Sequence, residues 1–283
     1  MRSCLRQPFF HDTMLTLTMR PPSGITNLRF LPNLVLLCLS MIGFDSCEQL
    51  AKPQITEETV QTYRLSAGAK VKVESSCGAI SVSGWDREEC RVEAVRRASG
   101  SAELALITLE VDAMGDSVSI RATAPPGSGS NPNHGPRVDI RMWVPHDAEL
   151  ENIVSGRGEV TIIDTDGSVV AWSMNGSVIA ERTRGNLALK CVNGRTVARL
   201  STLANGQRVD LETVNGSTTV VLPAQASVEV SAQVVNGNVI SDLGLLIGSD
   251  FPTGRKMEGR LGTGGATVSA RTVNGSVSIW KGR

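Results

Sequence analysis

The sequence predicts an all-β fold in which antiparallel strands lead into a β-solenoid, resembling a single-stranded β-helix of stacked coils. Residues alternate between apolar and polar through the first half, and an Asn-Gly motif recurs through the second. The first four Asn-Gly motifs are 18, 22 and 21 residues apart, which predicts coils of about 18–22 residues. Only 4% of the residues are aromatic, so the core must be built from small aliphatic side chains, which suits packed β layers.

Residues 1–47 are predicted to be an export leader. An apolar stretch at residues 31–44 follows Arg20 and Arg29, and its 14 residues are too few to span a bilayer, which takes ~20. This length fits the apolar region of a signal peptide. Cys47 follows a small residue, as the acceptor cysteine of a bacterial lipoprotein does, so we expect either lipidation at Cys47 or ordinary cleavage nearby. Residues 48–57 are predicted to be a tether.

Residues 58–145 are predicted to form an N-terminal β region that caps the first coil. Alternation with a period of two predicts strands with one buried and one solvated face. It occurs at residues 71–74, 80–83, 92–95, 109–112, 118–121 and 138–141. Strand edges at the ends of a stack invite aggregation unless they are covered. We expect the N-terminal strands to close one end and Trp280 with residues 281–283 to close the other.

Two cysteines, Cys77 and Cys90, bracket a candidate hairpin of this region. An exported chain can oxidise such a pair, so a disulfide and two free thiols are both open interpretations. Cys191 has no evident mate and has the same parity as Leu187 and Leu189, which predicts a small buried hydrophobic residue.

Residues 146–283 are predicted to form the repetitive β-solenoid. Glycines recur every nine residues from Gly158 to Gly194, and glycine favours corners because it accepts positive φ. Nine is odd, so each unit needs a corner that resets which side chains face inward. The predicted structural turns are Asn175, Gly176, Asn193, Gly194, Asn215, Gly216, Asn236, Gly237, Asn274 and Gly275.

Stacked coils would align these asparagines, so that their side-chain amides form a ladder. Asn-Gly is also the strongest short hairpin signal, and an antiparallel meander is therefore the alternative to the coil.

These segments resemble the bacterial putative-adhesin family, a domain of unknown function found in envelope β-solenoid proteins. The similarity covers about residues 58–280 and begins with the strand, glycine turn and strand at residues 73–86. It ends with a glycine-rich step into a last Asn-Gly strand pair at residues 262–279. The resemblance implies an exported, non-enzymatic protein, with residues 244–260 as a variable loop before the final coil. It implies no particular binding residues.

An outward apolar cluster is predicted near the start of the repeats. If Ala171 faces inward, then Val170 and Trp172 face outward, beside Ile163 and Ile179 on neighbouring units. The favoured interpretation is that the N-terminal strands cover this face. The alternative is an interface, because contiguous exposed apolar surface usually marks one.

The sequence supports no enzyme, metal site or nucleic-acid site. Formal net charge is zero, so there is no basic field to hold nucleic acid. Calcium-binding nonapeptides repeat an aspartate and several glycines, whereas one glycine recurs here. Glycan-cleaving β-helices need paired carboxylates or a base in a groove, and the three histidines, His11, His134 and His146, lie in the leader or on predicted loops. We expect no catalytic residue, cofactor, metal or small-molecule substrate.

The predicted function is a non-enzymatic adhesin or surface scaffold of the bacterial envelope, periplasmic or at the cell surface. Its expected partner is a protein or glycan surface, with a lipid anchor if Cys47 is modified. One alternative is a regulatory envelope protein that acts with a membrane sensor or anti-sigma factor. A glycan-cleaving β-helix enzyme is the less favoured alternative.

Overall fold

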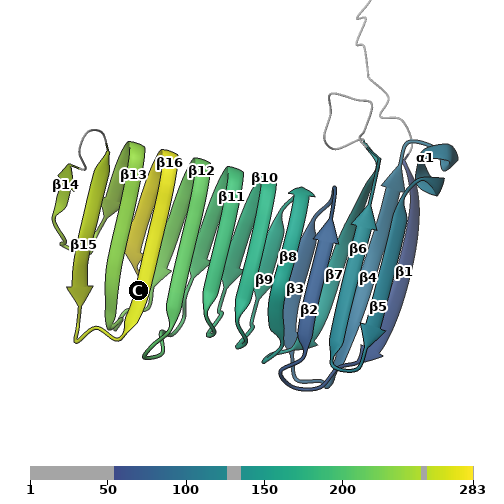
Figure 1. Ribbon diagram of the computed structural model, residues 1–283, viewed down its shortest axis with the longest axis horizontal. Coiled ribbons are helices and arrows are strands. Elements are labelled where there is room, and N and C mark those ends of the chain that lie inside the picture. The colour runs from purple at the N-terminus through teal and green to yellow at the C-terminus, as the bar shows by residue number, and fades with distance from the viewer. Residues whose placement is uncertain (1–53, 126–134, 250–253, 283) are drawn as a thin grey trace, which may run out of the picture. The chain divides into compact units, whose positions relative to one another are not determined.

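The structure is a computed structural model that describes residues 54–125, 135–249 and 254–282, all in one compact unit. It is all-β, as predicted, and its strands join into one large sheet (Figure 1). The predicted leader, with Cys47, lies outside the described residues. The described residues contain no helix that is long and apolar enough to cross a membrane.

The described part of the N-terminal region contains seven strands and one short helix. These elements are β1 (Ile55–Arg64), β2 (Lys70–Ser75), β3 (Ile80–Trp85), β4 (Glu89–Ala98), α1 (Ser101–Ala105), β5 (Thr108–Met114), β6 (Ser117–Thr123) and β7 (Arg137–Pro145). β1 starts at Ile55, inside the stretch that the sequence assigned to a tether.

Nine further strands are described in the repeat region, and five of them are long. These strands are β8 (Glu149–Arg157), β9 (Val160–Ile163), β10 (Val169–Glu181), β11 (Leu187–Arg199), β12 (Arg208–Leu222), β13 (Val228–Ser241), β14 (Ile247–Ser249), β15 (Arg255–Leu261) and β16 (Ala266–Lys281). The five Asn-Gly motifs lie inside the five long strands, β10, β11, β12, β13 and β16.

Strands about one repeat apart pair in parallel. Asn175 of β10 is opposite Asn193 of β11, 18 residues later, and Asn193 is opposite Asn215 of β12, 22 residues later. β8 pairs with the first half of β10 and β9 with its second half, both in parallel. The five Asn-Gly motifs are therefore not hairpin turns, and the antiparallel meander is wrong for these strands.

Each long strand passes from one layer to another at its Asn-Gly corner. In β10, Val169, Ala171 and Ser173 are buried before the corner, and Val178 and Ala180 are buried after it. The step of five residues from Ser173 to Val178 is odd, so the corner resets the alternation. The buried side chains of the two halves face one another, and Figure 1 shows strands in a front and a rear layer.

The core between these layers is aliphatic, as the composition predicts. Its largest fully buried side chains are Leu, Ile and Met, with no aromatic residue among them in the described chain. Burying one such side chain contributes about 1.5–3 kcal/mol, so the stack is stabilised by many similar contributions along its length.

The strand order differs from the sequence order at the C-terminal side. β16 lies between β12 and β13 and pairs in parallel with both. The outer strands at this end are β15 and β14, which add to β13 in antiparallel pairing. The expectation that Trp280 and residues 281–283 close the end of the stack is therefore wrong. The predicted variable loop at residues 244–260 contains β14 and most of β15, the strands that do close it.

The N-terminal strands extend the sheet at the other end. β2 pairs in parallel with β8, and β3 pairs in parallel with β9, so both continue the stack. Beyond β3 come β7, β4 and β1, and the last two pairings are antiparallel. Beyond β2, β6 pairs in parallel and β5 is antiparallel at the edge.

Candidate functional site: the outward face of the repeat strands

Column of corner glycines

The corners are aligned in a column of glycines. Gly176, Gly194, Gly216, Gly275 and Gly237 all have φ between 142° and 159°. A Cβ atom on Gly194 would lie 1.6 Å from the carbonyl oxygen of Gly176, and each glycine of this column meets the one before it in the same way. No other residue could be accommodated without moving the backbone.

Buried side chains three residues before these glycines support the column. The Ser173 hydroxyl donates to the Gly158 carbonyl at 3.0 Å, and Thr272 does the same to Gly216 at 3.3 Å. Cys191 occupies the equivalent position, with its sulfur 3.2 Å from the Gly176 carbonyl, and burial raises the pKa of its thiol. The prediction of a buried Cys191 is confirmed. Its role as a hydrogen-bond donor is visible only when the strands are aligned.

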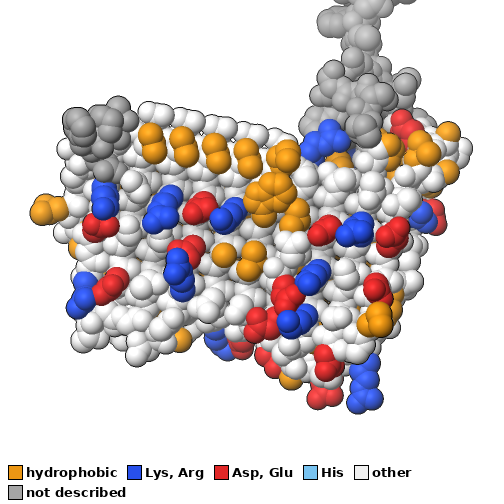
Figure 2. Space-filling view, viewed as in Figure 1, with side chains coloured by type: hydrophobic (Ala, Val, Ile, Leu, Met, Phe, Trp, Pro, Cys, Tyr) orange, Lys and Arg blue, Asp and Glu red, His pale blue; other side chains and the backbone are white. Residues whose placement is uncertain are grey.

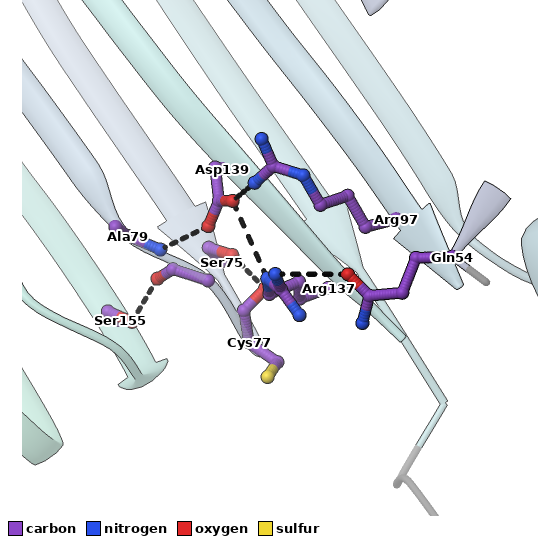
Figure 3. Close-up of polar contacts among 9 residues, drawn as sticks. Gln54, Ser75, Cys77, Ala79, Arg97, Arg137, Asp139 and Ser155 are labelled. Carbon is purple, nitrogen blue, oxygen red and sulfur yellow. Dashed lines mark hydrogen bonds and ion pairs between the residues drawn. The ribbon is translucent and has the colours of Figure 1, made fainter. Parts of the chain in front are cut away.

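The first corner of the stack, between β2 and β3, uses other contacts (Figure 3). Asp139 of β7 accepts a hydrogen bond from the Ala79 N–H at 3.0 Å and pairs with Arg97 of β4. The Ser155 hydroxyl donates to the Gly78 carbonyl at 3.0 Å. These bonds position Gly78 at the head of the glycine column, where its carbonyl faces Gly158.

Asparagine ladder and apolar row

The predicted asparagine ladder is present. The side-chain amide of Asn193 donates to the Asn175 carbonyl oxygen, and each following asparagine donates to its neighbour, every bond being 2.9 Å long. In space the order is Asn175, Asn193, Asn215, Asn274 and Asn236. Each interior asparagine keeps one amide N–H free for solvent or a ligand.

An exposed apolar row runs beside this ladder. The residue before each asparagine is apolar, and the side chains lie next to one another because the strands are in register. Figure 2 shows this row of hydrophobic side chains across β10, β11, β12, β16 and β13. Its members are Met174, Val192, Val214, Val273 and Val235. Met174 is 45% exposed and Val214, Val273 and Val235 are 41% exposed, so the row is open to solvent.

A second, mostly charged row lies two residues earlier on the same face. It consists of Trp172, Lys190, Glu212, Arg271 and Gln233, taken in the spatial order of the strands. Lys190 and Glu212 form an ion pair at 2.9 Å. We call the outward side of the first halves of these five strands the repeat face.

The predicted apolar cluster is divided between two layers. Val170 and Trp172 lie on the repeat face, in the first half of β10. Ile179 lies in the second half of β10, and Ile163 in β9, which pairs with that half. The four side chains therefore do not form one patch. The expectation that N-terminal strands cover Val170 and Trp172 is also wrong, because β2 joins β8 edge to edge and Val170 remains 45% exposed.

Cysteines, corner ion pairs and other predicted sites

Cys77 and Cys90 are free thiols, so the disulfide interpretation is wrong. The Cys77 carbonyl accepts from the Val138 N–H, near the start of β7, whereas Cys90 precedes Arg91, which pairs with Trp143 near its end. Val138 and Trp143 are five positions apart along β7, a distance of roughly 17 Å. This distance is far too long for a disulfide. Cys90 is buried, which raises the pKa of its thiol to about 12.

Ion pairs join successive repeats at the corners opposite the asparagines. Arg182 binds Asp164 through two bonds of 2.6 and 2.8 Å, and Arg184 pairs with Asp166 at 3.2 Å. Asp164 and Arg182 are the described non-glycine residues with positive φ, at 56° and 54°. The hydrogen bond from Arg182 lowers the pKa of the Asp164 carboxyl. The 18-residue offset of each pair equals the spacing of the first two Asn-Gly motifs, so these pairs could have been predicted from the sequence.

Of the three histidines in the sequence, His146 lies in the described part of the chain. Its Nδ1 lies 2.6 Å from the Asp164 carbonyl oxygen, and its Nε2 lies 3.3 Å from the exposed Asp86 carboxylate. His11 and His134 lie outside the described residues. Within the described ranges, no group of three or more His, Cys, Asp or Glu side chains could hold a metal ion.

Comparison with known proteins

A solved structure of a known protein shares this fold. A putative cell adhesion protein from Clostridium sporogenes ATCC 15579 matches with a TM-score of 0.50 and 14% identity, over 81% of this chain and 100% of that one. The chain has the fold of that protein. At this identity the match shows the fold alone.

Two further structures match more distantly. They are a putative adhesin from Bacteroides fragilis NCTC 9343, with a TM-score of 0.29, and a putative lipid binding protein from Parabacteroides distasonis ATCC 8503, with 0.28. Each is 11% identical, over 80% of this chain and 97% of its own. No family model and no curated protein matches the chain. The resemblance that the sequence indicated is confirmed, at the level of the fold, by the Clostridium sporogenes structure.

Proposed function

We propose that this protein is a non-enzymatic, exported β-solenoid that binds another surface through its repeat face, as an adhesin or surface scaffold of the bacterial envelope. The observation that carries the proposal is the uncovered apolar row beside the asparagine ladder. Contiguous exposed apolar surface on a folded protein usually marks an interaction site.

The in-register stack supports the solenoid part of the proposal. Five strands place equivalent side chains at intervals of about 4.8 Å, so apolar, amide and charged groups each recur in straight rows. Such a surface suits a partner that is itself flat or repetitive, because many weak contacts can then form together.

In this proposal, the leader provides for export of the protein and for its attachment to a membrane. A signal peptide would deliver the chain to the periplasm or cell surface, and lipidation of Cys47 would anchor it to a membrane through the tether. The similarity in fold to a putative cell adhesion protein agrees with a surface role.

Matched substitutions in one strand test the proposed binding face. Val214→Lys changes the apolar row, whereas Thr219→Lys places the same charge in the second half of β12, on the other layer. We expect the fluorescently labelled protein to bind intact cells or isolated envelope of its own bacterium. Val214→Lys should reduce this binding at least tenfold, and Thr219→Lys should leave it within twofold.

Equal loss in both variants, with unchanged melting temperatures, would contradict binding through the repeat face. Absence of binding by the unmodified protein to cells, envelope fractions and extracellular matrix would contradict the adhesin role itself.

A further inference from the structure

A shallow hollow lies on the repeat face where β12, β16, β13 and β15 are adjacent. Its floor is made of short outward side chains, Thr267 and Ser269 of β16 and Ser231 of β13. Longer side chains border it, with Arg208 and Asp210 on the β12 side and Glu258 and Arg260 on the β15 side. In this region of Figure 2, charged side chains surround an area of uncharged polar side chains and backbone, which is drawn in white.

The charges that line the hollow are balanced. Three arginines and three carboxylates contribute, and they are Arg208, Arg260, Arg271, Asp210, Glu229 and Glu258. Because the net charge is zero, an anionic or cationic ligand gains no net attraction from this lining. The hollow therefore favours a neutral ligand.

Ion pairs hold several of these groups in place. Arg208 binds Asp210 at 2.5 Å, and Arg260 binds Glu229. A guanidinium has five N–H donors and a carboxylate accepts about four hydrogen bonds, so each pair leaves most of this capacity free. Groups already ordered by their partners lose less entropy when a ligand binds.

The floor has further unused hydrogen-bonding capacity. The side-chain hydroxyls of Thr267 and Ser269 have no hydrogen-bond partner among the described residues. The Ser231 hydroxyl makes one long bond of 3.4 Å to Glu258. A ligand for this surface must therefore be rich in groups that both donate and accept, and hydroxyl groups do both.

We infer that this hollow binds a neutral saccharide. The inference rests on the proposed adhesin function and gives its ligand a chemical class. The four strands span roughly 14 Å, which accommodates a short oligosaccharide across them. No aromatic side chain lines the hollow, so binding depends on hydrogen bonds and is weak for one site, with Kd of about 1 mM. Multivalent presentation of the glycan raises the apparent affinity.

A glycan array with the purified protein tests the inference. The array carries neutral oligosaccharides of hexoses and N-acetylhexosamines at high density, and uronate-containing and sulfated oligosaccharides as charged arms. We expect retention on at least one neutral class and weaker retention on the charged arms. Ser269→Gln fills the floor of the hollow and should reduce retention at least tenfold.

Ala188→Gln is the matched control. Ala188 is an outward residue of β11, in the same cross-strand row as Asp210 and Ser269 but two strands from Ser269. This variant should retain binding within twofold, and both variants should melt at the temperature of the unmodified protein.

The inference would be overturned if the array retained no neutral glycan, if a charged arm were retained more strongly, or if Ser269→Gln and Ala188→Gln had equal effects. The proposed function is tested separately, by the binding of the protein to cells. If Ser269→Gln still binds cells as the unmodified protein does, the adhesin role stands and the saccharide site is wrong.

Discussion

At the scale of single residues, the corner glycines show how closely successive strands approach. Gly194 has φ of 146° and no room for a Cβ atom, whereas Gly206 has φ of 82° and open space around it. The two positions separate the cost of strained backbone from the cost of overlap with a neighbouring strand.

We expect Gly194→Ala to destabilise the protein by at least about 3 kcal/mol, because strain and overpacking add. This corresponds to a fall of roughly 6–12 °C in melting temperature for a domain of this size. Gly206→Ala should cost about 1 kcal/mol, for strain alone. Thermal melting of both variants is the measurement, and equal shifts would show that the glycine column does not depend on close approach.

The asparagine ladder has a direction that substitutions can reveal. Asn175 at one end only accepts a ladder bond, whereas Asn193 accepts one and donates one. Asn175→Asp keeps its acceptor and should change the free energy of unfolding by less than about 0.5 kcal/mol. Asn193→Asp loses the donor to Asn175 and should cost about 1 kcal/mol. Urea denaturation at pH 7 compares the stability of the two variants. A larger loss of stability for Asn175→Asp would show that the ladder bonds run in the opposite direction.

At the scale of strands, pattern and spacing predicted which segments form strands and how the corners work. Glycine at every ninth residue predicted the corners, and the odd period predicted the reset of alternation that Ser173 and Val178 display. Parallel pairing was also predictable, because strands that lie one repeat apart carry the same Asn-Gly corner. These features depend on local residues, which a sequence displays directly.

The position of β16 could not be predicted in the same way. All five long strands carry an Asn-Gly corner, so any order of stacking would align glycines and asparagines equally well. In the structure β15 occupies one side of β13 and β16 occupies the other. The hollow on the repeat face depends on this order, because it brings Ser269 beside Ser231. Sequence spacing therefore gave no signal for the hollow.

The hairpin of β14 and β15 is expected to protect the C-terminal end of the stack. Antiparallel pairing with β15 covers the backbone of residues 228–234 in β13. Replacing residues 242–265 by a short Gly-Ser connection should expose this edge and cause association that increases with protein concentration. Sedimentation measurements report it. Removal of residues 281–283 is the control and should leave the sedimentation unchanged, because Lys281 pairs with Leu222 inside the stack.

At the scale of the whole described unit, the N-terminal region and the repeats share one sheet. β2 and β3 contribute Val71, Val73, Ile80 and Val82 to the same core as β8 and β9. β1, in contrast, has no buried residue and pairs only with β4. The N-terminal region therefore contains strands that differ greatly in how much they stabilise the stack.

Two truncations test this difference. A chain that starts at His146 lacks β2 and β3, so β8 and β9 each keep β10 but lose their other parallel partner, and one edge of each is exposed. We expect this fragment to aggregate, as measured by light scattering, and to lose its single cooperative melting transition. A chain that starts at Leu65 lacks only β1 among the described strands and keeps the buried Leu65, so it should keep one cooperative transition because little apolar surface is uncovered. A soluble, monomeric fragment from His146 that melts cooperatively would show that the repeats fold alone and that β2 and β3 belong to a separate domain.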